Sequence, residues 1–152
     1  MEKQALFAGG CFWGVEAKFQ TLPGVLQTQV GYAGGSTEKP CYREVCQDTT
    51  GHAETVMIIY DPDQISYQQL LEAFFEFHDP TMCDCHAGDF GSQYRSVVFY
   101  SCEEEKETAE QVIAFLDVSG IYDHGILTQV VPAGPFYPAE EYHQQYYKKH
   151  GL

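Results

Sequence analysis

A change from strand to helix is encoded in the stretch Gln4-Ala5-Leu6-Phe7-Ala8-Gly9-Gly10-Cys11-Phe12-Trp13-Gly14-Val15-Glu16. Its first five residues are mostly apolar and predict a short buried strand, which the two glycines end. Beyond the glycines, apolar side chains recur at helical spacing, at Phe12, Val15, Phe19 and Leu22. The sequence therefore predicts that Cys11 lies in the first turn of a helix.

Cys11 is a candidate reactive thiol because of this position. The free backbone N–H groups and the positive dipole end of a helix favour a thiolate and lower the pKa of a thiol below its ordinary value. The alternative is a purely structural role, in which Cys11 is a small buried side chain in an aromatic cluster. Glycines on both sides favour the reactive interpretation, since they let the backbone approach a ligand closely. Trp13 is turned by about 100° from Phe12 on the predicted helix, which leaves its ring available to wall a pocket.

Length and composition predict one domain over residues 1–152. A chain of 152 residues with 44% hydrophobic content is large enough to bury a sizeable core. Its formal net charge of −14 argues against nucleic acid or an anionic membrane as a partner. No apolar run approaches the roughly 20 residues needed to span a bilayer, and the first residues do not resemble a signal peptide. We therefore expect a cytoplasmic protein.

The six cysteines allow two interpretations, and they lie at positions 11, 41, 46, 83, 85 and 102. A secreted disulfide framework is one, but the chain can bury a core without such cross-links. Free or redox-active thiols fit better. Cys102 is expected to be structural.

The remaining pattern alternates strands, helices and two long irregular stretches. Strands are expected at 25–32, 54–60, 96–100 and 126–131. Helices are expected after capping boxes at Ser66/Gln69 and Ser101/Glu104, and a terminal helix from Pro138 bearing Tyr142, His143 and Tyr146. This order predicts an α+β two-layer sandwich with helices packed on a mixed β-sheet, and we expect a ferredoxin-like core.

Glu54 opens an otherwise apolar strand directly after Gly51-His52. Its carboxyl group either points to solvent or is partly desolvated in a pocket. Desolvation would raise its pKa and make it a usable general acid.

Nine segments, in order along the chain, resemble the peptide methionine sulfoxide reductase A family. They are 10–16 (GCFWGVE), 31–35 (GYAGG), 42–46 (YREVC), 51–54 (GHAE), 60–62 (YDP), 65–67 (ISY), 78–81 (HDPT), 93–96 (QYRS) and 142–144 (YHQ). Each motif is weak alone, but the ordered set runs from about residue 4 to 148.

The resemblance implies reduction of methionine S-sulfoxide, free or in proteins, by a peptide-methionine (S)-S-oxide reductase without metal or flavin. By position, Cys11 is the nucleophile and Glu54 protonates the departing oxygen. The resemblance also implies that Phe12 and Trp13, beside Gly10, form an apolar pocket for the substrate methyl group. Tyr42 and Tyr94 would donate hydrogen bonds to the sulfoxide oxygen, and Asp89 would organise the site. His52 and Glu16 would be supporting residues.

The sequence departs from the family in the part that recycles the enzyme. We expect the glycine-rich C-terminal tail that carries resolving cysteines in many members to be absent here, and the stretch Asp84-Cys85-His86-Ala87-Gly88-Asp89 keeps only its last residue from the family pattern. Either Cys85, Cys83 or Cys41 condenses with the sulfenic acid of Cys11 to give a disulfide for thioredoxin, or glutathione with glutaredoxin acts directly.

Two other classes of function are kept as alternatives. A redox-sensing or metal-binding module would use His78, Cys83, Cys85 and His86 as ligands, although the one-residue gap between the two cysteines is not the usual zinc-knuckle spacing. A thiol peroxidase also uses a cysteine of low pKa, but the peroxidase threonine-cysteine motif is absent from this sequence.

Overall fold

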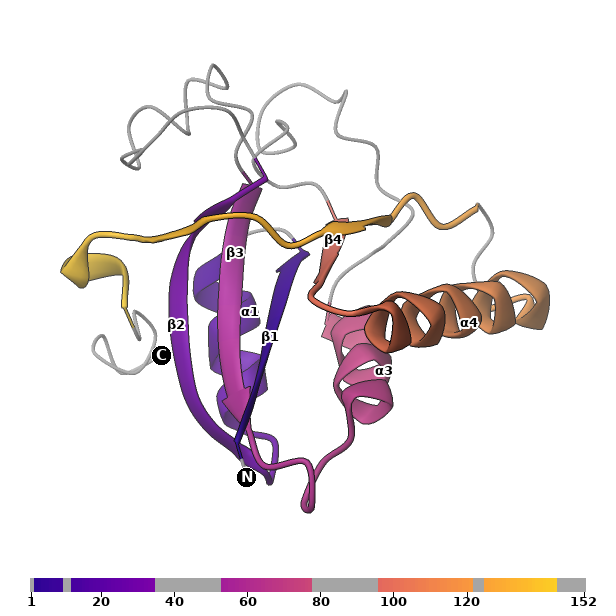
Figure 1. Cartoon of the computed structure of the whole chain (residues 1–152), viewed down its shortest axis with the longest axis horizontal. Helices are drawn as coiled ribbons and strands as arrows, with labels where there is room; N and C mark the ends of the chain where they lie inside the picture. The colour runs from indigo at the N-terminus through magenta and orange to yellow at the C-terminus, as the bar shows by residue number, and fades with distance from the viewer. Residues whose placement is uncertain (1, 10–11, 35–52, 78–95, 122–124, 145–152) are drawn as a thin grey trace.

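The computed structural model describes residues 2–9, 12–34, 53–77, 96–121 and 125–144, except for the side chains of Phe12 and Tyr142 (Figure 1). Its elements, in chain order, are β1 (Lys3–Gly9), α1 (Phe12–Gln20), β2 (Val25–Ala33), β3 (Ala53–Tyr60), α3 (Tyr67–Phe77), β4 (Ser96–Tyr100), α4 (Glu103–Ser119), β5 (Gln129–Pro132), β6 (Phe136–Pro138) and the short 3-10 helix η2 (Glu141–His143).

One six-stranded sheet organises the molecule, in the order β5-β4-β1-β3-β2-β6. The pair β4–β5 is parallel, and the other neighbouring pairs are antiparallel. The sheet is therefore mixed, and with helices α1, α3 and α4 it confirms the predicted α+β class.

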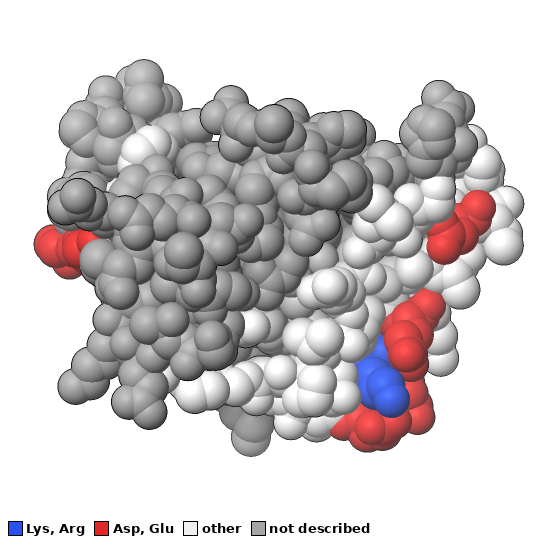
Figure 2. All heavy atoms as spheres, turned by 90° about the horizontal axis from the view of Figure 1, so that it is seen from above, with Lys and Arg blue, Asp and Glu red and all other residues white. Residues whose placement is uncertain are grey.

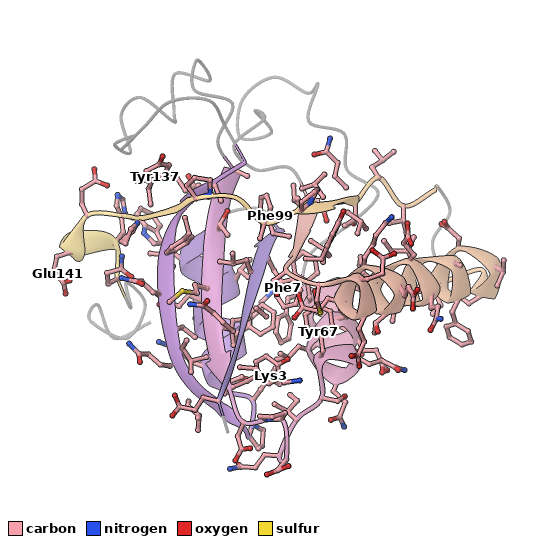
Figure 3. All side chains as sticks on the ribbon, viewed as in Figure 1. Lys3, Phe7, Tyr67, Phe99, Tyr137 and Glu141 are labelled. Atoms are coloured by element: carbon pink, nitrogen blue, oxygen red, sulfur yellow. The ribbon has the colours of Figure 1, made fainter. Side chains whose placement is uncertain are left out.

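The helices bury their apolar faces against one side of the sheet. Successive strand residues point to opposite faces, so the side chains of Ala5 and Phe7 enter the helix-covered core whereas that of Ala8 enters a cluster on the other side. Phe7 is the centre of the aromatic packing: its ring stacks at centroid distances of 5.7 Å on Phe19 of α1 and 4.9 Å on Phe74 of α3. Phe7 and Tyr67 also point toward one another between the sheet and α3 (Figure 3), with ring centroids 5.9 Å apart.

The opposite face of the sheet carries a smaller apolar cluster, formed by Ala8, Ala33, Ala53, Val97 and Phe99. The C-terminal segment passes in front of the strands on this side (Figure 1), and its residues Ala133 and Phe136 pack on the cluster. Farther along, Ala139 belongs to the helix-side core. The segment therefore crosses one face, pairs with β2 as β6, and turns round the β2 edge to reach the other face.

The two predicted capping boxes have different outcomes. The box at the start of α3 is confirmed, because Ser66 N–H donates to Gln69 Oε1 at 2.9 Å and Gln69 N–H donates to Ser66 Oγ at 3.0 Å. The box at Ser101 is wrong: the N-cap of α4 is Cys102, which makes no side-chain capping bond. Ser101 instead donates its backbone N–H to Glu105 at 2.8 Å, one residue farther than the motif requires.

The C-terminal elements also differ from the prediction. The expected strand at 126–131 is found at 129–132, and no terminal helix begins at Pro138. Pro138 ends β6, where pairing with β2 holds the chain extended, and only the 3-residue η2 follows within the described residues. Pairing with the sheet thus overrides the helix-start preference of proline.

Gly31 is the point at which β6 crosses closely over β2. A side chain built at Gly31 would collide with the backbone oxygen of Tyr137 and the ring of Phe136. The absence of a Cβ here is therefore a condition for β6 to pair with β2.

We expect Gly31→Ala to lower the free energy of unfolding by roughly 1–3 kcal/mol, because the added methyl group overpacks a buried contact. Gly134→Ala is the matched control, since a Cβ at Gly134 meets nothing within 4 Å. Urea unfolding of both variants measures the difference. Equal stability of the two variants would contradict the steric argument.

Candidate active site

Strands β1, β3 and β4 bring Gly9, Glu54 and Ser96 to one end of the sheet. Gly9 at the end of β1 is paired with Ser96 at the start of β4. On the other side of β1, Phe7 is paired with Val56, and the same register continued by two residues brings Gly9 level with Glu54. The end of the strand that leads to Cys11 therefore lies between the start of β3 and the start of β4.

Glu54 is buried at this end, with 1% of its surface exposed. It is paired with the buried Tyr32 of β2, and residues directly opposite in an antiparallel pair share a face. Because Tyr32 and Val56 both belong to the helix-side core, the Glu54 side chain lies on the side of the sheet that α1 covers. Of the two alternatives for this carboxyl group, the buried one is confirmed and the solvent-exposed one is wrong.

Trp13 lies in the first turn of α1 and packs against the same core. Its indole Nε1–H donates to His143 Nδ1 at 2.9 Å, and the two ring centroids are 5.5 Å apart. An Nδ1 atom that accepts a hydrogen bond carries no proton, so the neutral imidazole holds its proton on Nε2. The bond fixes the direction of the Trp13 ring from a residue 130 positions away.

His143 is held in its neutral form by its surroundings. Only 1% of its surface is exposed, and burial lowers its pKa below the ordinary value of 6.5, an effect partly opposed by the negative charge of Glu140. Glu140 in turn accepts a hydrogen bond from the Tyr32 hydroxyl group at 3.0 Å. The C-terminal segment therefore touches both Trp13 and the strand residue paired with Glu54.

Gln144 anchors this segment to β2. Its amide group accepts from Val30 N–H at 2.8 Å and donates to the Val30 carbonyl at 2.8 Å and the Ala139 carbonyl at 3.0 Å. The Gln144 side chain thus forms hydrogen bonds with both the backbone N–H and the backbone carbonyl of Val30, as a neighbouring strand would. This role of Gln144 was not predicted from the sequence; the only signal was that His143 and Gln144 are adjacent in one of the nine segments.

Glu16 is a second buried carboxyl group, with 1% of its surface exposed. Its Oε2 accepts a hydrogen bond from Thr28 Oγ1 at 2.9 Å, and Gln20 donates to the same hydroxyl oxygen at 3.1 Å. These bonds tie α1 to β2. The geometry is that of a residue that positions the helix.

Comparison with known proteins identifies the family. A family model described as peptide methionine sulfoxide reductase matches residues 3–152. The chain belongs to this family. A relative from Acidobacterium capsulatum, named peptide methionine sulfoxide reductase MsrA, is 51% identical over 149 residues, which cover 98% of this chain and 96% of the relative. A relative from Acinetobacter baumannii with the same name is 51% identical over 147 residues, which cover 97% of this chain and 83% of the relative.

Solved structures of similar proteins have the same fold. Reduced Mxr1 from Saccharomyces cerevisiae superimposes with a TM-score of 0.91 at 31% identity, covering 99% of this chain and 87% of Mxr1. Methionine sulfoxide reductase A of Corynebacterium diphtheriae gives 0.85 at 36% identity, covering 99% and 76%. Mxr1 in complex with Trx2 gives 0.68 at 25% identity, covering 95% and 84%. The predicted family and reductase activity are confirmed, and the metal-binding or redox-sensing alternative is not favoured.

Several residues expected in the site of this reductase lie outside the described residues. They are Gly10, Cys11, Tyr42, Asp89 and Tyr94, the side chain of Phe12, His52, the candidate resolving residues Cys41, Cys83 and Cys85, and the alternative ligands His78 and His86. Among the residues that are described, no cluster of histidine, cysteine or carboxylate side chains is able to hold a metal ion. In the same residues, no helix is long and apolar enough to cross a membrane.

We expect the reductase to lose stability as the pH falls below about 6.5, in part through His143. Because its folded pKa is lowered, the unfolded chain binds more protons between the two pKa values, so the free energy of unfolding decreases with falling pH in that window. Protonation of Nδ1 also removes the acceptor for Trp13. His143→Gln keeps an acceptor without a titrating group and should weaken this dependence.

Urea unfolding at pH values on either side of the window measures this effect. Trp13 is the only tryptophan in the chain, so its fluorescence reports the same titration. An unchanged fluorescence titration in His143→Gln would show that another group is responsible.

Proposed function

We propose that this chain reduces methionine S-sulfoxide to methionine, free or in proteins, by thiol chemistry in one catalytic domain spanning residues 1–152. The observation that carries the proposal is the buried Glu54 carboxyl group at the sheet end where β1 leads into Cys11. Cys11 follows Gly9 by two residues in the sequence. The Cys11 thiol thus follows the end of β1, and the buried Glu54 acid lies at the neighbouring start of β3.

Cys11 is the nucleophile in this proposal. It immediately precedes α1, whose free N–H groups and positive dipole end stabilise a thiolate. The thiolate attacks the sulfoxide sulfur, Glu54 gives its proton to the oxygen, and the oxygen passes to Cys11 as the thioether leaves. The products are a sulfenic acid on Cys11, a Glu54 carboxylate and methionine, so two electrons move from the cysteine sulfur to the substrate sulfur.

Glu54 suits the role of proton donor because of its burial. A desolvated carboxyl group is favoured in its neutral form, which is the form that donates a hydrogen bond to the sulfoxide oxygen. Donors aimed at that oxygen stabilise the charge that develops during attack. Tyr42 and Tyr94 are proposed as further donors and Asp89 as the residue that organises them. Tyr94 lies two residues before Ser96, which is paired with Gly9.

Trp13 is proposed as a wall of the pocket for the substrate methyl group, together with Phe12 and beside Gly10. The hydrogen bond to His143 holds the indole ring in one orientation. A ring fixed before the substrate arrives costs less entropy on binding.

Cys11→Ser is expected to abolish sulfoxide reduction, because a hydroxyl group at neutral pH is a far weaker nucleophile than a thiolate. Cys102→Ser is the control: Cys102 is free and exposed, and its loss should leave turnover unchanged. Reduction of a methyl sulfoxide under excess dithiothreitol measures both. Substantial activity in Cys11→Ser would refute the mechanism.

Glu54→Gln should lower the turnover rate by about 10²-fold or more, because the amide has nearly the same shape but no proton to transfer. Glu54→Asp should lose less where the shorter acid still reaches the oxygen. The turnover number at saturating substrate is the quantity to measure. Near wild-type turnover in Glu54→Gln would assign proton donation to Tyr42 or Tyr94.

Recycling is proposed to pass through a second thiol and then thioredoxin. The sulfenic acid condenses with that thiol, which forms a disulfide and releases water, and a dithiol reductant restores both thiols. The complex of Mxr1 with Trx2 supports thioredoxin as the reductant. We favour Cys85 or Cys83 over Cys41, because both lie in a glycine-containing stretch that leads toward Asp89 and Tyr94. Direct reduction by glutathione with glutaredoxin is the competing route.

Replacing Cys83 and Cys85 together by Ser should preserve the first turnover and stop cycling supported by thioredoxin. Protein mass after one equivalent of substrate is a second readout: loss of two hydrogens indicates an internal disulfide, and gain of one oxygen a stable sulfenic acid. Normal cycling in the double variant would exclude this pair. Loss of cycling in Cys41→Ser would instead assign the resolver to Cys41.

Two finer assignments are also proposed. The element order β1-α1-β2-β3-α3-β4 and the strand order β4-β1-β3-β2 support a ferredoxin-like core. The free, exposed thiol of Cys102 supports a reducing compartment such as the cytoplasm. Blocking thiols at cell lysis, followed by mass measurement, tests the compartment, because recovery of Cys102 in disulfide form would argue against it.

A further inference from the structure

Helices α3 and α4 enclose a groove of about 550 Å³ that shares no residue with the candidate active site. Its apolar surface comes from Phe75 of α3, from Val112, Phe115 and Leu116 of α4, and from Ile121 beyond the end of α4. The polar side chains that line it are Gln68, Glu72, Glu76, Thr108 and Gln111. The groove thus combines apolar side chains from both helices with two carboxylates on the α3 wall.

The α4 end of this groove exposes large apolar side chains to solvent. Phe115 is 69% exposed and Ile121 is 66% exposed, and the neighbouring Val118 is 84% exposed. Two of the five large hydrophobic side chains that are exposed among the described residues therefore line this groove, and Val118 lies between them in the sequence. Exposed apolar side chains that line a groove are typical of an interaction site.

The charge around the groove selects the kind of partner. Helices α3 and α4 together carry eight acidic residues and one basic residue, Lys106. Figure 2 shows several acidic side chains and one small basic area on the side of the molecule where α4 lies, and a further acidic group at the opposite edge. Glu72 and Glu76 are exposed on the groove wall itself. A second copy of the chain would bring another net charge of −14 to this surface, which opposes self-association.

We propose that the α3–α4 groove docks a basic, amphipathic segment of another polypeptide. Its apolar side chains would cover Phe115 and Ile121, and its lysine or arginine side chains would face Glu72 and Glu76. This combines two general modes of recognition: an amphipathic helix laid into an apolar groove, and complementary charge at the rim that speeds and orients association. Docking at this surface is separate from the chemistry at Cys11 and needs no methionine sulfoxide in the partner.

The test uses a fluorescent 18-residue peptide of leucine and lysine at helical spacing, without methionine, titrated with the full-length protein and followed by anisotropy. Two control peptides separate the two parts of the proposal. One has the same composition in scrambled order, so it keeps the charge without the apolar face. The other replaces every lysine by glutamate, so it keeps the apolar face and reverses the charge. We expect only the basic amphipathic peptide to bind.

Matched protein variants locate the binding site. Phe115→Ala should weaken binding about tenfold, whereas Leu26→Ala, at another exposed apolar residue, should change it less than about twofold. The pair Glu72→Gln and Glu76→Gln should weaken binding about tenfold at low salt, and this difference should shrink in high salt, where charges are screened. Glu2→Gln with Asp63→Asn makes the same change in net charge at exposed residues outside the groove and should have little effect.

Each remaining outcome decides the proposal. Turnover of free methionine sulfoxide by Phe115→Ala should equal that of the parent protein, which shows that weaker peptide binding does not result from unfolding. Equal binding of the control peptides, or equal weakening by the control variants, would overturn the proposal. Sedimentation that shows a dimer dissociated by Phe115→Ala would assign the groove to a second copy and overturn it as well. Peptide binding by a protein without reductase activity would uphold the groove and refute only the proposed function.

Discussion

The position of β1 between β3 and β4 is the constraint on which the rest of the structure depends. Backbone pairing on both sides of β1 sets the register that brings Gly9, Glu54 and Ser96 to one end of the sheet. The ring of Phe7 on the same strand stacks on residues of both α1 and α3, so the strand also locates the helices. A shift of one residue would turn Phe7 to the opposite face and remove Glu54 from its place beside the end of β1.

The C-terminal segment also helps to position the residues of the candidate site. Gln144 fastens the segment to Val30, and the absence of a side chain at Gly31 lets β6 pair alongside. In the segment held in this way, the His143 ring lies within hydrogen-bonding distance of Trp13. The orientation of the Trp13 ring therefore depends on contacts made on the β2 edge of the sheet.

The sequence predicted the elements whose signals are local. The strand ending at Gly9 and the helix beginning at Phe12 follow from a change in apolar spacing, and the Ser66 capping box follows from two residues three positions apart. The errors arise where tertiary contacts decide. Pro138 was expected to begin a helix, but pairing of β6 with β2 keeps it extended. Ser101 bonds to Glu105 rather than acting as the cap of α4.

The candidate site likewise contains residues that the sequence predicted and a residue whose role it did not predict. Trp13 and Glu54 were found from short motifs, whereas the contribution of His143 was not, because its partner is 130 residues away and no local pattern encodes that contact. Glu16, Glu54 and His143 are each 1% exposed, which is costly for groups able to carry charge unless hydrogen bonds or neutralisation compensate. Glu16 meets this requirement through Thr28, and His143 through Trp13 and its lowered pKa. For Glu54, burial alone works against the charged form, and the role of proton donor proposed above uses the neutral form.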